Sequence, residues 1–167
     1  MKNDLLKLSA ELGVHLVLSQ KMLAVAESCT GGLIATLLTE IAGSSAWFDR
    51  GFVTYSNVAK RQMLNVQEHT LEKFGAVSAE TALEMVSGAL LFSEADCAIA
   101  VTGIAGPSGG TNDKPVGTVY LAWAIKGHKD YCEHHLYHGD RHQIRLQTAH
   151  RAVQYLLETL KIKMLSG

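Results

Sequence analysis

The sequence has little of what marks a secreted or membrane-bound protein. Its three cysteines, Cys29, Cys97 and Cys132, are odd in number and form no C-x-x-C pair. That pattern argues against a disulfide framework and favours a reducing compartment. The N-terminal segment has no apolar signal-peptide core, and no apolar run approaches the ~18 residues of a membrane span. The sequence therefore predicts a cytoplasmic protein that does not contact membranes.

The chain also lacks a large charge of either sign. Fifteen Lys and Arg residues oppose sixteen Asp and Glu residues, for a net charge of -1 with the histidines neutral. A nucleic-acid-binding surface would show a basic excess, so no nucleic-acid partner is expected. With 47% hydrophobic and 19% charged residues, the composition is that of a globular protein. We expect a single domain over residues 1–167.

Apolar periodicity predicts helices that alternate with short buried strands. Helices are expected over residues 5–16, 33–41, 58–64, 78–89 and 149–160, and strands over residues 22–26, 51–55, 97–101, 118–125 and 130–137. Ser78 is expected to cap its helix, and the last two strands read as a hairpin. This order predicts an α/β fold, with three layers (α/β/α) around a mixed, mostly parallel sheet.

Ligands of such sheets bind at the carboxyl ends of strands, and the first unusual strand end is the segment 27–32. It places Ser28 in a Gly-rich turn just before a helix N-terminus, where unpaired backbone N–H groups can bind an anion or an oxyanion. Gly31 and Gly32 would allow a ligand to approach the backbone closely. Ser28 or Thr30 could equally serve only as the cap of the helix. The turn does not match the G-x-S-x-G elbow.

The second unusual strand end is the segment 102–110, which holds four glycines and a proline. It matches neither a Walker loop nor a dinucleotide fingerprint. Its backbone could cradle a phosphate or a ribose, or it could be a rigid surface loop.

A serine nucleophile needs a base; Tyr55 stands at the end of the second predicted strand, and Lys60 lies on the helix predicted after it. A lysine held in an apolar pocket can lose its proton near neutral pH and act directly or through a tyrosine. A solvated surface lysine is the other interpretation of Lys60, and the sequence alone does not decide between them.

Two other arrangements could carry chemistry. Four histidines (His134, His135, His138 and His142) raise the question of a metal, but no convincing ligand set accompanies them, so no metal or cofactor is expected. Cys29 could replace Ser28 as nucleophile, because helix N-termini lower thiol pKa values, or it could be an inert buried thiol.

Several motifs resemble one known family. They read AESCTGG (26–32), AGSSAWF (42–48), VTYSN (53–57), AK (59–60), GAVS (75–78), TGIAGP (102–107), KPVGTV (114–119) and GDR (139–141). In this order they resemble the C-terminal domain family of the competence-damage protein CinA, and especially its stand-alone amidases. The resemblance covers residues from about 22 to 160.

The resemblance implies a homodimeric, metal-independent enzyme that hydrolyses nicotinamide mononucleotide to nicotinic acid mononucleotide and ammonia. It assigns the nucleophile to Ser28 and the supporting groups to Tyr55 and Lys60, which would form a proton relay. Backbone N–H groups of residues 29–32 or of the 102–110 loop would hold the oxyanion. The expected substrate-binding residues are Thr30, Gly31, Gly32, Thr102, Gly103, Ile104, Ala105, Gly106, Arg141 and Arg145. A hydrolase of another small amide and a non-catalytic nucleotide-binding or competence-associated module stay open as alternatives.

Overall fold

The computed structural model describes residues 2–166, with side chains through residue 163. Its helices and strands follow in the order α1 Lys2–Leu18, β1 Leu23–Glu27, α2 Leu33–Thr39, η1 Ser44–Ala46, β2 Phe48–Val53, α3 Asn57–Leu64, α4 Glu68–Phe74, α5 Ala79–Leu91, β3 Cys97–Gly103, β4 Thr118–Ile125, β5 Tyr131–Leu136 and α6 Arg141–Ser166.

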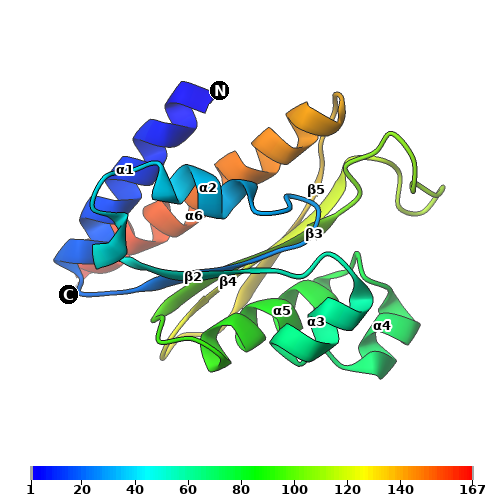
Figure 1. The fold of residues 1–167 in the computed structure, drawn as a ribbon, viewed down its shortest axis with the longest axis horizontal. Helices are drawn as coiled ribbons and strands as arrows, with labels where there is room; N and C mark the ends of the chain where they lie inside the picture. The colour runs from blue at the N-terminus through cyan, green and yellow to red at the C-terminus, as the bar shows by residue number, and fades with distance from the viewer. Residues whose placement is uncertain (1, 167) are drawn as a thin grey trace.

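The five strands form one sheet in the order β2-β1-β3-β4-β5. β1 pairs in parallel with β2 and β3, whereas β4 runs antiparallel to both of its neighbours. Four of the five strands thus point the same way, as predicted for a mixed, mostly parallel sheet. Helices α1, α2 and α6 cover one face and α3, α4 and α5 the other (Figure 1), which confirms the three-layer α/β/α fold.

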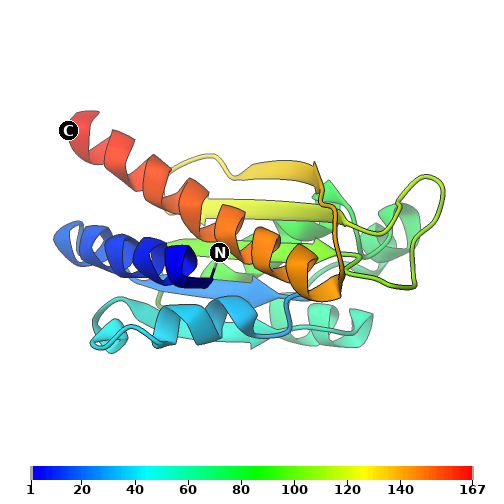
Figure 2. The same ribbon diagram turned by 90° about the horizontal axis from the view of Figure 1, so that it is seen from above.

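Each face of the sheet has its own core. Alternate residues of β3 serve the two faces: Ile99 packs under α1, α2 and α6, and Ala100 packs under α3 and α5. Seen from above, α1 and α6 run side by side over the sheet (Figure 2). Small side chains on the second face let α5 approach closely, and Gly88 of α5 rests against the backbone of Leu64 in α3. This contact sets the position of α3 over the sheet.

Most predicted elements are present, and three differ. β2 begins at Phe48 rather than at residue 51, and the short helix α4 was not predicted. α6 begins at Arg141, eight residues before the predicted start, because its first turn is polar and exposed and so lacks the apolar repeat. Ser78 caps α5 as expected, its hydroxyl accepting from the Thr81 N–H.

The carboxyl end of β1 lies where the chain connections on either side of it separate. After β1 the chain crosses one face through α2 to reach β2, and after β2 it returns over the other face through α3, α4 and α5 to β3. The carboxyl end of β1 is therefore flanked by connections that diverge to opposite faces. Such a switch point is where open α/β sheets bind ligands.

Candidate active site

Ser28 lies at this switch point, directly after β1. Its N–H donates to the Val101 carbonyl (3.1 Å), which extends the β1–β3 ladder by one residue and fixes the backbone. The chain then turns through Gly31 and Gly32, whose φ values of 56° and 94° favour glycine. The Ser28 side chain is mostly buried, at 8% exposure.

Lys60 reaches Ser28 from α3, which lies on the opposite face of the sheet from α2. α3, which carries it, begins at a Ser56 cap whose hydroxyl accepts from the Ala59 N–H (3.0 Å). The Lys60 side chain is 1% exposed, and its Nζ lies 3.0 Å from Ser28 Oγ. The structure thus joins two of the predicted catalytic residues and shows that Lys60 is not a surface charge.

The surroundings of the Lys60 amine suit its neutral form. Nζ donates to the carbonyls of Thr54 (3.0 Å) and Tyr55 (3.2 Å), which can only accept. In its neutral form the amine has two N–H groups and one lone pair; with both hydrogens on the two carbonyls, the lone pair would face Ser28 Oγ, 3.0 Å away. Burial lowers the pKa of Lys60, because the charged form loses its hydration. Within residues 2–163, no carboxylate forms an ion pair with Lys60.

Tyr55 does not occupy the place that a relay through its hydroxyl requires. The side chain is 60% exposed, and its hydroxyl accepts a hydrogen bond from Arg141 Nη2 (2.9 Å). Only the backbone carbonyl of Tyr55 contacts Lys60. In this geometry the Tyr55 hydroxyl is paired with Arg141, and Lys60 reaches Ser28 without an intermediate.

Ser28 opens onto a cleft of about 200 Å³ at this edge of the sheet. Its lining contains seven of the predicted residues: Ser28, Tyr55, Lys60, Thr102, Gly103, Ala105 and Arg141. It also contains four residues not proposed as substrate contacts from the sequence: Cys29, Asn57, Ala76 and Val77. The segment 75–78 is one of the sequence motifs that resemble the CinA family. That resemblance is the signal that could have indicated Ala76 and Val77.

The 102–110 loop is tied down where it borders the cleft. Thr102 Oγ1 donates to the Ala76 carbonyl (2.7 Å), and Arg141 Nη1 donates to the Gly106 carbonyl (2.9 Å). Gly103 leaves no room for a side chain against Val119. Residues 107–110 are exposed, so the first half of the loop forms a cleft wall and the second half is surface.

Thr30, Gly31, Gly32, Ile104, Gly106 and Arg145 lie next to the cleft but do not line it. Arg145 Nη2 donates to the Thr30 carbonyl (2.6 Å), so this arginine supports the turn after Ser28. The N–H of Gly31 donates to the Ser28 carbonyl, and that of Gly32 to the Glu27 carboxylate. These two N–H groups are therefore not available to hold an oxyanion.

Neither Ser28 nor Thr30 caps α2. The side chain in that role is Glu27, which the sequence analysis did not single out. Its carboxylate accepts from the N–H groups of Gly32 (3.1 Å), Ile34 (3.0 Å) and Ala35 (2.8 Å). Sequence rules place caps within a few residues of a helix start, whereas this carboxylate reaches back from the end of β1.

Cys29 is a poor alternative nucleophile. Burial, with a smaller contribution from the Glu27 charge, raises the pKa of its thiol to about 12. The helix N-terminus that would lower this pKa is already occupied by Glu27. At neutral pH Cys29 is therefore a protonated thiol.

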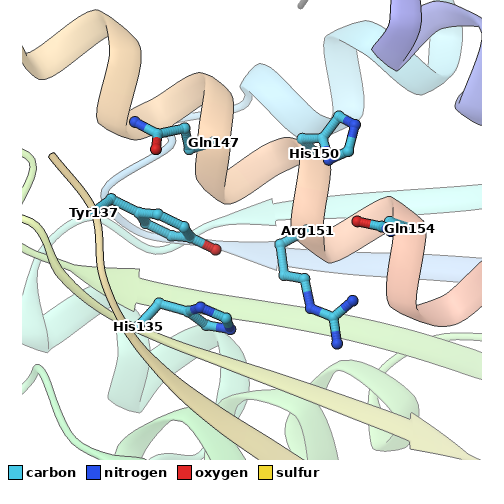
Figure 3. Close-up of a pocket in the computed structure, with 6 residues that line it drawn as sticks. All are labelled: His135, Tyr137, Gln147, His150, Arg151 and Gln154. Carbon is cyan, nitrogen blue, oxygen red and sulfur yellow. The ribbon is translucent and has the colours of Figure 1, made fainter. Parts of the chain in front are cut away.

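A larger hollow of about 330 Å³ lies between β5 and α6 (Figure 3). His135 and Tyr137 stack on each other there, and Arg151 pairs with Glu133 through Nη2 and Oε1 (2.6 Å). It contains no serine, and the Arg151 charge is engaged by Glu133. This hollow therefore offers no candidate nucleophile comparable to Ser28.

The four histidines are not gathered into a ligand set. His135 Nε2 contacts Glu133, His134 stacks on Tyr120, and His138 and His142 are exposed. Over the described residues, no group of three or more His, Cys, Asp or Glu side chains is arranged to hold a metal ion.

Comparisons with known proteins identify the family of the chain. The CinA C-terminal domain family matches residues 5–160. The chain belongs to this family.

Relatives in the CinA family match over nearly their whole length. A protein of Enterobacter agglomerans is 51% identical, with 90% of this chain and 92% of the relative covered, and one of Escherichia coli K12 is 48% identical, with 95% and 93% covered. Both are named nicotinamide-nucleotide amidohydrolase PncC.

Solved structures of the family share the fold. The competence/damage-inducible protein CihA of Agrobacterium tumefaciens superposes with a TM-score of 0.92 at 50% identity, covering 95% of this chain and 96% of that one. A competence damage-inducible protein of Klebsiella pneumoniae gives a TM-score of 0.91 at 39% identity, covering 94% and 97%.

Proposed function

We propose that this chain hydrolyses the carboxamide of nicotinamide mononucleotide, giving nicotinic acid mononucleotide and ammonia, with Ser28 as nucleophile and Lys60 as base. The observation that carries the proposal is the buried contact of 3.0 Å between Lys60 Nζ and Ser28 Oγ. The choice of substrate rests on relatives of 47–51% identity, which are named nicotinamide-nucleotide amidohydrolase PncC.

Neutral Lys60 removes the Ser28 proton as Oγ attacks the carboxamide carbon. The resulting tetrahedral intermediate collapses when protonated Lys60 gives its proton to the departing nitrogen, which leaves as ammonia. An ester between Ser28 and the nicotinate carbonyl then remains. Lys60 next removes a proton from water as the water oxygen attacks the ester carbonyl. The bond between the carbonyl carbon and Ser28 Oγ then breaks, and protonated Lys60 returns the proton to Oγ, which restores Ser28. The sum is one amide and one water converted to one carboxylate and ammonium.

Arg141 is the proposed partner of the substrate phosphate, because it lines the cleft and arginine binds phosphate through paired N–H groups. The Arg141 guanidinium already donates a hydrogen bond to the Tyr55 hydroxyl. Tyr55 would therefore orient Arg141 or stack beside the ligand. Thr102, Gly103 and Ala105 would form the wall against the pyridine ring and the ribose. Arg145 and Thr30 would support the turn rather than touch the substrate.

An ammonia-release assay tests the proposal. Purified protein is incubated with nicotinamide mononucleotide, nicotinamide riboside and nicotinamide, beside Ser28→Ala as control. We expect release from the mononucleotide that exceeds release from the two substrates without phosphate and is abolished in the variant. Release from another amide alone would favour the hydrolase of a different small amide. Tight binding of the mononucleotide without turnover would favour a non-catalytic nucleotide-binding or competence-associated module.

We further propose that the enzyme acts in the cytoplasm as a homodimer, with no nucleic-acid or membrane partner. The near-zero net charge supports the absence of a nucleic-acid partner. No helix among residues 2–166 is both long enough and apolar enough to span a bilayer. Light scattering coupled to gel filtration measures the dimer directly, and a monomer mass would contradict it.

A further inference from the structure

Glu27 is a buried acid beside the proposed nucleophile that the mechanism above does not use. It is the last residue of β1 and is 1% exposed. A buried carboxylate without partners would be strongly unfavourable. Here three backbone N–H groups of the first turn of α2 satisfy it, at 2.8–3.1 Å.

These contacts use up the start of the helix. The remaining N–H of that turn, from Leu33, donates to the Thr30 carbonyl (3.1 Å). Helix N-termini attract anions because they carry unpaired N–H groups and the positive end of the helix dipole. In this protein the Glu27 carboxylate already occupies that position, so neither a substrate phosphate nor an oxyanion can bind at the N-terminus of α2.

The same contacts join residues on both sides of Ser28 in the sequence. Glu27 precedes it, and the three donors lie four to seven residues beyond it on α2, so the carboxylate clamps both ends of the turn that carries the nucleophile. Two N–H groups of the turn stay unused: those of Cys29 and Thr30 donate to no acceptor in the described part of the chain. Cys29 also lines the cleft.

We propose that Glu27 is a positioning residue: its carboxylate clamps the 28–32 turn so that Ser28 Oγ stays on Lys60 Nζ and the N–H group of Cys29, which lines the cleft, faces the developing oxyanion. This inference rests on the proposed function. A carboxylate is required because two acceptor oxygens serve three donors. Glutamine at this position would turn its amide N–H₂ toward at least one backbone N–H, and aspartate would hold the charge one methylene too far away.

The test compares Glu27→Gln with Glu40→Gln, which removes the same charge from an exposed position at the other end of α2. We expect Glu27→Gln to lower kcat for nicotinamide mononucleotide by about 10- to 100-fold, less than the ~10²- to 10³-fold lost with a direct oxyanion donor, because Glu27 acts through the turn, while KM changes little. The pH at which kcat/KM rises should stay that of the parent enzyme, because Glu27 transfers no proton. Glu40→Gln should match the parent in every respect. An unchanged kcat in Glu27→Gln, or a loss confined to KM, would overturn the proposal.

A second measurement separates this proposal from the identity of the substrate. A small fluorophosphonate reacts with an activated serine without needing the nucleotide pocket. Its rate of reaction with Ser28 should fall in Glu27→Gln in parallel with kcat, and this holds even if the parent protein releases no ammonia from the mononucleotide. An equal rate in both proteins would contradict the clamp. If Glu27→Gln does not fold, Glu27→Asp takes its place with the same expectation. Failure of both to fold, while Ser28→Ala folds normally, would make Glu27 a folding residue and overturn its positioning role.

Discussion

Lys60 Nζ lies 3.0 Å from Ser28 Oγ, although Ser28 directly follows a strand of the sheet and Lys60 lies on a helix that covers one face of it. Ser28 directly follows β1, which lies between β2 and β3 in the sheet, and Lys60 reaches it from α3. The pair forms because both residues converge on the switch point of the sheet. This contact supports the proposed roles of Ser28 as nucleophile and Lys60 as base.

Ser28→Ala should lower kcat/KM by at least ~10³-fold, since loss of the nucleophile removes the covalent pathway. Cys29→Ala should keep most of the activity, because its thiol has a pKa of about 12 and stays protonated. Steady-state ammonia release by the two variants checks this. Full activity in Ser28→Ala together with an inactive Cys29→Ala would reverse the assignment.

Tyr55 and Arg141 should behave as one unit, because the Tyr55 hydroxyl accepts from Arg141 Nη2. We expect the double variant Tyr55→Phe/Arg141→Ala to lose no more activity than the worse of the two single variants. The pH at which kcat/KM rises should be the same in Tyr55→Phe as in the parent, since Lys60 contacts Ser28 directly. Strictly additive losses would show that the two side chains act separately, and a moved pH limb would restore a relay through the Tyr55 hydroxyl.

Activity should survive exhaustive treatment with EDTA. The residues that line the cleft offer hydroxyl, amine, guanidinium and backbone groups and the Asn57 carboxamide, with Cys29 the one thiol and no carboxylate or imidazole among them. Divalent metals prefer carboxylate, imidazole and thiolate ligands. Ammonia release measured before and after chelation tests this. Recovery of a lost activity on adding a divalent ion would disprove it.

Gly88→Ala should destabilise the fold and displace the base. A methyl group there would overlap the Leu64 carbonyl, so α3 would have to move away from α5. Overpacking of this kind costs about 1–3 kcal/mol, and each kcal/mol lowers Tm by about 2–4 °C in a domain of this size. Leu91→Ala, an exposed change on the same helix, serves as control. A Tm for Gly88→Ala equal to that of the control would show that the contact does not set the position of α3.

The alternation of helices and strands could be predicted because burial imposes a period on the sequence. Leu5, Leu12 and Leu16 repeat along α1, and the short apolar runs mark β1 and β3. The polar first turn of α6 carries no such period, so the place of Arg141 on a helix could not be predicted.

The catalytic pair was harder to predict than the fold. Ser28 stands out through its strand, glycine turn and helix, but the partner of Ser28 depends on how α3 is oriented. One signal was present: Lys60 precedes the buried Leu64 by four residues, and positions i and i+4 share a helix face. The role of Glu27 could not be predicted, because its carboxylate caps a helix from the preceding strand.

The most direct test of the account is the pH dependence of kcat/KM for nicotinamide mononucleotide, measured for the parent enzyme and for Lys60→Arg. Burial lowers the pKa of Lys60 below the ordinary ~10.4 of a lysine. In the proposed mechanism deprotonated Lys60 is the base, so kcat/KM should rise with pH up to that lowered pKa and level off above it. Arginine keeps its proton, so Lys60→Arg should lose about 10²- to 10⁴-fold, the usual contribution of a general base, and should show no such rise. A rise that persists unchanged in an active Lys60→Arg would contradict Lys60 as the base of Ser28.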